Sequence, residues 1–315
     1  MEHRSLTARA LGRIAMLTRR ARGRWATEAI LRHRYRQQCG RDLDLDHPLT
    51  MTDKIYARML LIDRHRDESV TALADKYLVR QTIAEVVGET HLVPLLWQGG
   101  DPAQIPFDDL PTPAILKPNH LTGSLITITP ELDRAWAVRH ARGWLRESMY
   151  WPAREYQYHP ITRRLIVEAF IDDGQPNGPL DYSVWCFHGR AHLVQIRDRS
   201  KELNYFVDTN FVRQQVYADT NPDVVASRPR SWDRLLECAA ALAAPFEFVR
   251  VDLYDVHGHV YVGELTFTPA RGRLRFASPE WDARLGALWH FDPGRPVLPH
   301  DAPDAFRPSP TGPTR

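Results

Sequence analysis

The sequence predicts an α+β fold, with helices in the first part of the chain and short strands in much of the rest. From Ser5 to about Gln38 apolar residues recur at helical spacing among arginines, and capping signals predict two further helices before residue 89. After residue 91, short apolar runs separated by turn residues are typical of strands. The clearest strand pair lies in residues 249–267, where two β-branched and aromatic runs flank a polar turn.

The composition is that of a globular protein. At 315 residues the chain is long enough for one large domain or two to three small ones, and 43% hydrophobic and 25% charged residues are ordinary values. The three cysteines are far apart and form no metal-ligand pair, so we interpret them as reduced thiols of a cytoplasmic protein. No apolar run reaches the length of a signal-peptide core or a membrane span, which argues against both.

The first forty residues are rich in arginine, although the net charge of the whole chain is only +2. We expect a basic amphipathic helix or helix pair here, within a helical N-terminal segment that covers residues 1–74. Two interpretations of this basic arm stay open. It is a solvated helix packed on the domain, or it attaches the protein to an anionic membrane surface or to a biosynthetic complex.

Two helices are expected before the first strand. Thr52 is a candidate N-cap for a helix through Ile62, and a second helix runs from about residue 69 through 87, ending at Gly88. This second helix carries Lys76. A short strand over residues 92–97 and a connection rich in proline and aspartate follow.

The next stretch has the pattern of a phosphate-binding loop. An apolar strand ends in Lys117, a turn contains Thr122, Gly123 and Ser124, and a second strand covers residues 125–129. Small and hydroxyl residues in such a turn leave backbone donors free to face phosphate oxygens. The alternative is a plain hairpin that carries a surface lysine.

The remaining elements are assigned from the same patterns. We expect helices over residues 130–149 and 232–244, and strands over residues 165–171, 182–187 and 191–197. The strand over 165–171 is apolar except for Glu168. From residue 291 the chain is rich in proline and aspartate, and we expect a disordered tail over 291–315.

The hairpin near the C-terminal end carries charges that are costly to bury. Alternation places Arg250 and Asp252 on one face of the first strand, and Val262, Glu264 and Thr266 on one face of the second. If these faces coincide, two carboxylates and a guanidinium converge. A divalent cation that carries a nucleotide would satisfy the acids, because Mg2+ is held by one or two carboxylates plus substrate phosphates. The alternative is a buried arginine-carboxylate bridge in an ordinary hairpin.

Several stretches together resemble one superfamily. Their order and approximate spacing resemble those of the ATP-grasp superfamily. The amino-acid sequence from about residue 50 to 286 is similar to the TupA-like branch of this superfamily, which is linked to teichuronopeptide and cell-surface polysaccharide synthesis. The stretches are Asp75-Lys76, Leu116-Lys117, Glu168-Ala169-Phe170-Ile171, Arg250-x-Asp252 and Glu264-x-Thr266.

The resemblance implies a role for each of these positions. Lys76 and Lys117 would reach the phosphates of ATP, and the strand from Glu168 through Phe170 to Ile171 would line the adenine. Thr122, Gly123 and Ser124 would form the loop that covers the phosphates. Asp252 and Glu264 would hold Mg2+, with Glu264 bridging two ions, and Arg250 would face the transferring phosphoryl group.

Two positions depart from the pattern that the resemblance implies. The wider superfamily usually has asparagine where this chain has Thr266, so the third metal contact would be a hydroxyl, a feature that the TupA-like branch shares. Ser183 stands where the branch pattern leads us to expect a lysine, which removes one positive charge.

The resemblance also implies the domain plan. Two α+β subdomains, over residues 75–165 with the phosphate loop and 166–290 with the metal-binding hairpin, would clamp ATP after the helical segment 1–74 and before the tail 291–315.

The expected activity is that of a carboxylate-amine ligase that uses ATP and Mg2+ and acts through an acylphosphate, on small-molecule, glycan or peptide substrates. Two alternatives stay open: a kinase on the same scaffold that phosphorylates a hydroxyl, and a catalytically weak nucleotide-binding subunit of a polysaccharide assembly complex. We expect a cytoplasmic protein, peripheral to the inner face of the membrane if its basic arm binds there, with no nucleic-acid partner.

Overall fold

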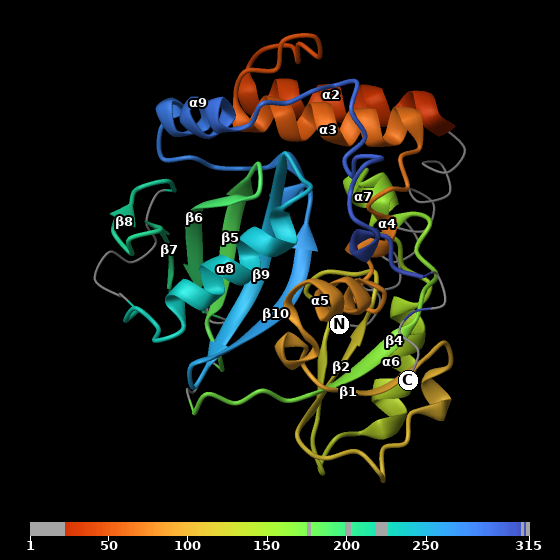
Figure 1. Ribbon diagram of the computed structural model, residues 1–315. Coiled ribbons are helices and arrows are strands. Elements are labelled where there is room, and N and C mark those ends of the chain that lie inside the picture. The colour runs from red at the N-terminus through yellow and green to blue at the C-terminus, as the bar shows by residue number, and fades with distance from the viewer. Residues whose placement is uncertain (1–22, 175–177, 199–202, 218–225, 310–311, 313–315) are drawn as a thin grey trace, which may run out of the picture.

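The computed structural model describes residues 23–174, 178–198, 203–217, 226–309 and 312. These residues form two antiparallel sheets with helices around them (Figure 1). The smaller sheet has the order β1-β4-β2-β3, with β1 Leu95–Gly99, β2 Ala114–Pro118, β3 Ile126–Ile128 and β4 Leu165–Ala169. The larger sheet has the order β10-β9-β5-β6-β7-β8, with β5 Asp181–Phe187, β6 Arg190–Arg197, β7 Asn204–Asp208, β8 Arg213–Gln214, β9 Phe248–Val256 and β10 His259–Thr266.

The helices cover these sheets from different sides. Helices α2, α3 and α9 lie together across one end of the larger sheet, and α8 covers one of its faces (Figure 1). Helix α6 packs on the smaller sheet, and α5 contacts both α8 and β10. The bounds are α2 Gly23–Cys39, α3 Met51–His65, α4 Thr71–Ala74, α5 Val79–Val87, α6 Arg134–Trp144, α7 Tyr150–Ala153, α8 Trp232–Ala243 and α9 Pro279–Leu288.

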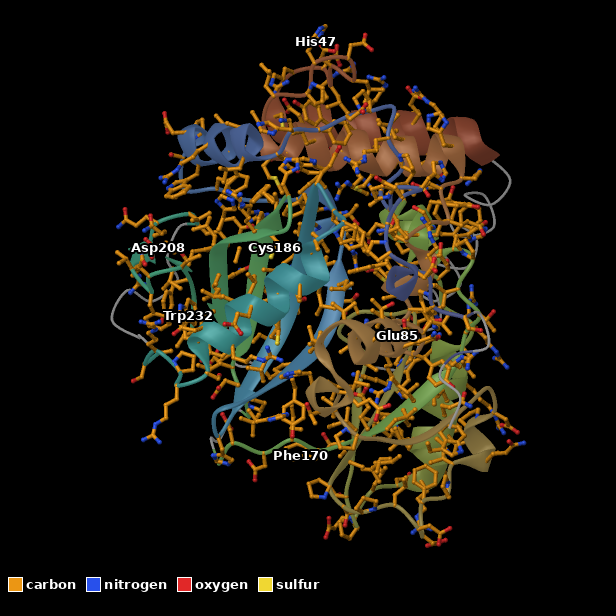
Figure 2. All side chains as sticks on the ribbon, in the orientation of Figure 1. His47, Glu85, Phe170, Cys186, Asp208 and Trp232 are labelled. Carbon is orange, nitrogen blue, oxygen red and sulfur yellow. The ribbon has the colours of Figure 1, made fainter. Side chains whose placement is uncertain are left out.

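The two faces of the larger sheet have different surroundings. On one face, Val184, Val251 and Leu265 pack with α8 in a core that also contains Cys186 and Trp232, both labelled in Figure 2. On the other face, the end of β5 that carries Trp185 and Phe187 packs beneath α3. The opposite end of this face begins at Asp181, which lines a cavity instead. The α2–α3 layer therefore leaves part of the sheet open for a functional site.

Helix α3 begins earlier than its sequence predicts. Thr50, not Thr52, is the N-cap: its hydroxyl accepts a hydrogen bond from the Asp53 backbone N–H, and the Asp53 carboxylate accepts one from the Thr50 N–H. This reciprocal capping box satisfies two backbone donors at once. Thr52 could not form such a box, because the residue three positions later is Ile55, whose side chain has no hydrogen-bond acceptor. The backbone N–H of Thr52 is bound instead by the Asp282 carboxylate.

The continuous helix expected over residues 69–87 is wrong. The chain forms two helices, α4 and α5, because the buried Asp75 carboxylate accepts hydrogen bonds from the backbone N–H groups of Tyr77 and Leu78. An aspartate that binds nearby backbone donors in this way competes with helix formation. The break places Lys76 in an irregular segment between the two helices.

The boundary between the two sheets also differs from the expected division after residue 165. Strand β4 pairs with β1 and β2, so it belongs to the smaller sheet and the division falls after Ala169. Residues 170 and 171, expected within this strand, lie after its end; Phe170 is labelled on the connection that leads to β5 (Figure 2).

The C-terminal segment is ordered from residue 291 to 309, contrary to the tail expected there. Leu298 and Phe306 are buried in the core beside α8, and the ring of Phe306 lies 5.7 Å from that of Phe246. These apolar contacts anchor a proline-rich segment whose composition alone predicts disorder. Residues 310–311 and 313–315 lie outside the described residues.

The N-terminal arm is only partly described. Helix α2 covers the end of the segment expected to be helical, and residues 1–22, which include most of its arginines, lie outside the described residues. In the part of the chain that the structure describes, no helix is both long and apolar enough to cross a membrane.

Candidate nucleotide and metal site

A cavity of about 530 Å³ lies between the two sheets, and we call it the main cavity. Its wall is built from α5, β2, β4, β5, β6, β9 and β10 and from the loops that follow β2 and β4. It contains all but one of the residues that the sequence marks as functional: Lys76, Lys117, Thr122, Gly123, Ser124, Glu168, Phe170, Ile171, Arg250, Asp252 and Glu264. The exception, Thr266, lines an adjoining cavity together with Arg250 and Glu264.

One side of the main cavity is organised by Glu168. Its carboxylate is 2.5 Å from Lys117 Nζ and 3.1 Å from Arg80 Nη1, so one acid holds two cations. Arg80 also donates to the Val93 carbonyl at 2.8 Å, which fixes its guanidinium. The sequence analysis did not identify Arg80 as a site residue. Arg80 lies four residues after Lys76, and the break between α4 and α5 brings both side chains to the cavity.

The loop after β2 forms the rim of the main cavity. Thr122 and Gly123 are exposed, and Gly123 has a φ of 72°, a conformation that side chains other than glycine rarely adopt. Lys76 Nζ donates to the Leu121 carbonyl at 3.1 Å, directly before this loop. The loop is therefore held at its base by the same lysine that faces the hairpin.

A β-bulge at Gly263 sets the geometry of the hairpin. Val262 pairs with Leu253, and the pairing then shifts so that Glu264 stands opposite Asp252. Because Leu253 and Asp252 lie on opposite faces of β9, their partners Val262 and Glu264 do too, and the expectation that these two share one face is wrong. The extra residue of a bulge re-aims the following side chain, and here it brings the two carboxylates together.

Four charged side chains form ion pairs and hydrogen bonds with one another where the hairpin meets the smaller sheet. Arg250 donates two hydrogen bonds to Asp252, at 2.7 and 2.5 Å, and lies 3.8 Å from Glu264. Lys76 Nζ is 2.8 Å from Glu264. Burial would raise the pKa of Glu264, but Lys76 and Arg250 outweigh it and hold this pKa well below its usual range. The carboxylate is therefore ionised at neutral pH.

The oxygens at this point suit a hard divalent cation. Thr266 Oγ1 lies 3.5 Å from Asp252 Oδ2 and 3.4 Å from Glu264 Oε1, so two carboxylates and one hydroxyl converge. Mg2+ binds oxygen ligands and keeps several positions for water and phosphate, which fits a small set of protein ligands. The described residues contain no group of three or more His, Cys, Asp or Glu side chains that could hold a metal ion.

A further cation stands beside Ser183. Arg197 on β6 donates to the Ser183 hydroxyl at 2.9 Å and lines the main cavity. The sheet thus presents a guanidinium next to the position where the resemblance leads us to expect a lysine. The sequence shows Arg197 only as one of several charges at strand ends; the pairing of β5 with β6 brings it to Ser183.

The adjoining cavity, of about 400 Å³, lies on the far side of the hairpin charges, and we call it the side cavity. Glu155 and Arg271 line it, with 3.7 Å between Oε2 and Nε, and the Thr268 hydroxyl donates to Glu155 at 2.5 Å. Burial raises the pKa of Glu155 to about 7. Nothing in the sequence singles out Glu155, because it lies in an irregular segment.

The raised pKa of Glu155 predicts a pH-dependent stability. Between about pH 4.5 and 7 the folded state binds a proton that the unfolded state has lost, so the stability that this group contributes falls as pH rises. We expect Glu155→Gln to gain stability relative to the wild type over this range, by at most roughly 3 kcal/mol. Denaturant unfolding of both proteins at pH 5 and pH 8 checks this; an unchanged difference would contradict it.

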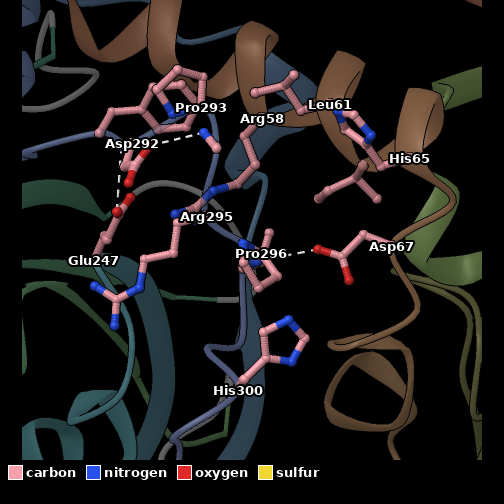
Figure 3. A pocket seen from close by; sticks show the side chains of 14 residues that line it. Arg58, Leu61, His65, Asp67, Glu247, Asp292, Pro293, Arg295, Pro296 and His300 are labelled. Atoms are coloured by element: carbon pink, nitrogen blue, oxygen red, sulfur yellow. Dashed lines mark hydrogen bonds between the residues drawn. The ribbon is translucent and has the colours of Figure 1, made fainter.

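Another cavity, of about 340 Å³, lies between α3 and residues 291–300 (Figure 3). Its acids make structural hydrogen bonds: Asp67 accepts from the Val297 N–H at 3.1 Å, and Glu247 accepts from Trp289 Nε1 at 3.1 Å. Arg58 donates to the Phe248 carbonyl at 2.7 Å. These bonds connect the ends of α3, β9 and the C-terminal segment to one another, so we assign this cavity no ligand.

Two antiparallel sheets, a loop at the rim of a cavity that contains two lysines, and a hairpin with paired acids are the features expected of the ATP-grasp class. Residues 53–290 match the family model described as TupA-like ATPgrasp, so the chain belongs to the TupA-like ATP-grasp family. The family and the α+β fold predicted from the sequence motifs are confirmed. No curated protein matches the sequence.

Among solved structures, the chain is similar over part of its length to two ligases and a synthetase. The D-alanine-D-alanine ligase from Bacillus anthracis complexed with ATP is 14% identical, with a TM-score of 0.42 over 70% of this chain and 62% of that one. The D-alanine-D-alanine ligase from Helicobacter pylori is 17% identical, with 0.41 over 69% and 61%. D-cycloserine synthetase DcsG is 18% identical, with 0.39 over 70% of each chain. The chain spans about three fifths of the length of the two D-alanine-D-alanine ligases.

Proposed function

We propose that this protein is an ATP- and Mg2+-dependent carboxylate-amine ligase that acts through an acylphosphate. The observation that carries the proposal is the pairing of Asp252 with Glu264 across the bulged hairpin, opposite Lys76. Buried carboxylates in such an arrangement are costly unless cations satisfy them. Arg250 pairs with Asp252 and Lys76 pairs with Glu264 in the structure.

The main cavity offers complementary groups for each part of ATP. Phe170 and Ile171, with the strand end at Glu168, provide a partly apolar wall for the adenine. Lys76 and Lys117 are cations that would bind the phosphates, as charge-assisted hydrogen bonds favour. The rim loop at Gly123 would cover those phosphates with its backbone donors.

Asp252, Glu264 and Thr266 would hold Mg2+. When bound, Mg2+ neutralises the negative charge that develops on the phosphates during transfer. In that state Lys76 would exchange its contact with Glu264 for one with phosphate, while Arg250 stays anchored on Asp252 and faces the reacting group.

The side cavity would hold the substrate carboxylate, because it adjoins the main cavity at Arg250 and Glu264. A carboxylate oxygen there would attack the terminal phosphorus of ATP, releasing ADP and leaving an acylphosphate. An amine would then attack the acyl carbon, and phosphate would leave as the amide forms. Positioned charges such as Arg250 favour both steps, because each develops negative charge on oxygen.

A hydroxylamine assay tests this reaction class. Hydroxylamine, a small strong nucleophile, should intercept the acylphosphate when a substrate acid is present. Across a panel of amino acids and uronic acids we expect acid-dependent hydroxamate with matching ADP release, and a reduced yield in Arg250→Ala. A stable phosphorylated hydroxyl product without hydroxamate would favour the kinase alternative.

From the composition we also propose a cytoplasmic location, and for the basic arm either attachment to an anionic membrane surface or packing as a solvated helix. Sedimentation with anionic vesicles at low and high salt distinguishes a membrane-binding arm, whose affinity falls with salt, from a solvated helix that binds at neither.

A further inference from the structure

Arg197 differs from the other cations that line the main cavity, because it has no ion pair. Each of the others lies within 4.0 Å of a carboxylate that also lines the cavity: Lys76, Arg80, Lys117 and Arg250. Among the residues that the structure describes, no carboxylate lies within 4.0 Å of the Arg197 guanidinium. Even Asp181, which stands opposite Arg197 in the pairing of β5 with β6, lies beyond this distance. The described cavity wall therefore leaves the charge of Arg197 without a direct partner.

The half-buried guanidinium of Arg197 also makes few hydrogen bonds. Nη2 donates to the Ser183 hydroxyl at 2.9 Å, and Ser183 itself is fully buried. Nε is buried without an acceptor, and Nη1 makes no hydrogen bond with a described residue. Buried N–H groups are normally paired, and a charge removed from water is costly unless an opposite charge meets it. An anionic ligand beside Arg197 would supply both the acceptors and the opposite charge.

The larger sheet places this guanidinium beside the hairpin acids without pairing it to them. On neighbouring strands, Glu264 stands opposite Asp252, and Asp252 stands opposite Ser183. Ser183 in turn stands opposite Gln195 on β6, and Arg197 follows Gln195 by two residues. Residues directly opposite each other share a face of the sheet, as do alternate residues of one strand, so Arg197 lies on the face of the acids. Its hydrogen bond to Ser183 directs the guanidinium across β5 towards them.

The main cavity and the side cavity meet at Arg197. Four of the described residues line both cavities, and they come from the rim loop, β6, β9 and β10: Thr122, Arg197, Arg250 and Glu264. In the proposed reaction the nucleotide lies in the main cavity and the substrate carboxylate lies in the side cavity. The terminal phosphoryl group is the part that passes from one substrate to the other. Arg197 lies on the path of that transfer.

We propose that Arg197 is a catalytic residue that binds the terminal phosphoryl group of ATP and holds it during transfer. This inference rests on the proposed function. As the substrate carboxylate oxygen bonds to the terminal phosphorus, the bond from that phosphorus to the bridging oxygen breaks, and ADP leaves with the bonding electrons. The Arg197 guanidinium donates to oxygens of the phosphoryl group before and after this step, since its planar fork of donors matches phosphate geometry. Arg250 is already paired with Asp252, so Arg197 is the arginine that is not committed to an acid.

The test compares two nucleotides in calorimetric titrations with excess Mg2+: ADP, and the non-hydrolysable ATP analogue adenylyl imidodiphosphate. Arg197→Gln removes the charge and keeps most of the side chain, whereas Arg197→Lys keeps the charge. In Arg197→Gln we expect about 10-fold weaker binding of the analogue, the scale for losing a charge-assisted hydrogen bond, and an unchanged affinity for ADP. Arg197→Lys should retain most of the affinity for the analogue. Both variants should fold, because neither substitution breaks an ion pair between described residues.

The rate of ADP release is a second readout. With an acid that supports hydroxamate formation and with saturating ATP, Arg197→Gln should release ADP at least about 10-fold more slowly, because the contact is expected to strengthen as the phosphoryl group leaves ADP. The control is Arg190→Gln, which removes a positive charge from an exposed position at the other end of β6, outside both cavities. It should bind both nucleotides and turn over like the wild type.

Three binding results would overturn the inference. Equal weakening of both nucleotides in Arg197→Gln would mean that the arginine only shapes the cavity. Unchanged affinity for both would mean that it does not contact ATP. A loss of the same size in Arg190→Gln would reduce the effect to net charge. Failure of the wild type to bind either nucleotide would instead reject the proposed function.

Discussion

Replacing Glu264 with glutamine is expected to lower turnover by at least about 100-fold, the scale for losing one electrostatic contact to a transition state. The amide keeps the shape of the side chain but removes the charge that would hold Mg2+ and that now pairs with Lys76. The measurement is ADP release with a substrate acid and hydroxylamine. We expect hydroxamate and ADP to disappear together.

The control for this variant is Glu237→Gln on α8, an exposed acid that pairs only with Arg234 in the described part of the chain. It should turn over normally. Because Glu264→Gln leaves Lys76 without its carboxylate, thermal melting must show that the variant is folded. A folded Glu264→Gln with near wild-type turnover would mean that the hairpin acids are structural.

Replacing Lys117 with alanine is expected to weaken ATP binding by about 10- to 100-fold, the range for losing a charge-assisted hydrogen bond. The loss should be specific, because Glu168 keeps its contact with Arg80 and is not left as an unpaired buried charge. Calorimetric titration measures the affinity. Arg142→Ala, which removes a positive charge from the surface of α6, is the control and should bind ATP like the wild type.

The sequence motifs predict six charged residues that line the main cavity: Lys76, Lys117, Glu168, Arg250, Asp252 and Glu264. It does not predict the geometry between them. Strict alternation places Val262 and Glu264 on one face, and only the bulge at Gly263 separates them. A glycine directly before an acid inside a strand is the one available signal, since such glycines often mark bulges.

The residues that sequence reasoning missed reach the cavities through tertiary contacts. Arg80 depends on the break between α4 and α5, which the Asp75 side chain causes, and Glu155 depends on a hydrogen bond from Thr268, more than a hundred residues away. No local pattern encodes such pairings. The ordered C-terminal segment was missed for a similar reason: Leu298 and Phe306 are isolated apolar residues whose burial depends on the surface of the folded core.

The most direct test of the central claim is a calorimetric titration of ATP into the wild-type protein, with excess Mg2+ and again with the metal chelated. If the main cavity is a nucleotide site whose hairpin acids hold the metal, ATP should bind once per chain, and its affinity should fall when Mg2+ is removed. Absence of ATP binding at millimolar concentration would contradict the account. So would an ATP affinity that changes neither when Mg2+ is removed nor when Lys117 is replaced by alanine.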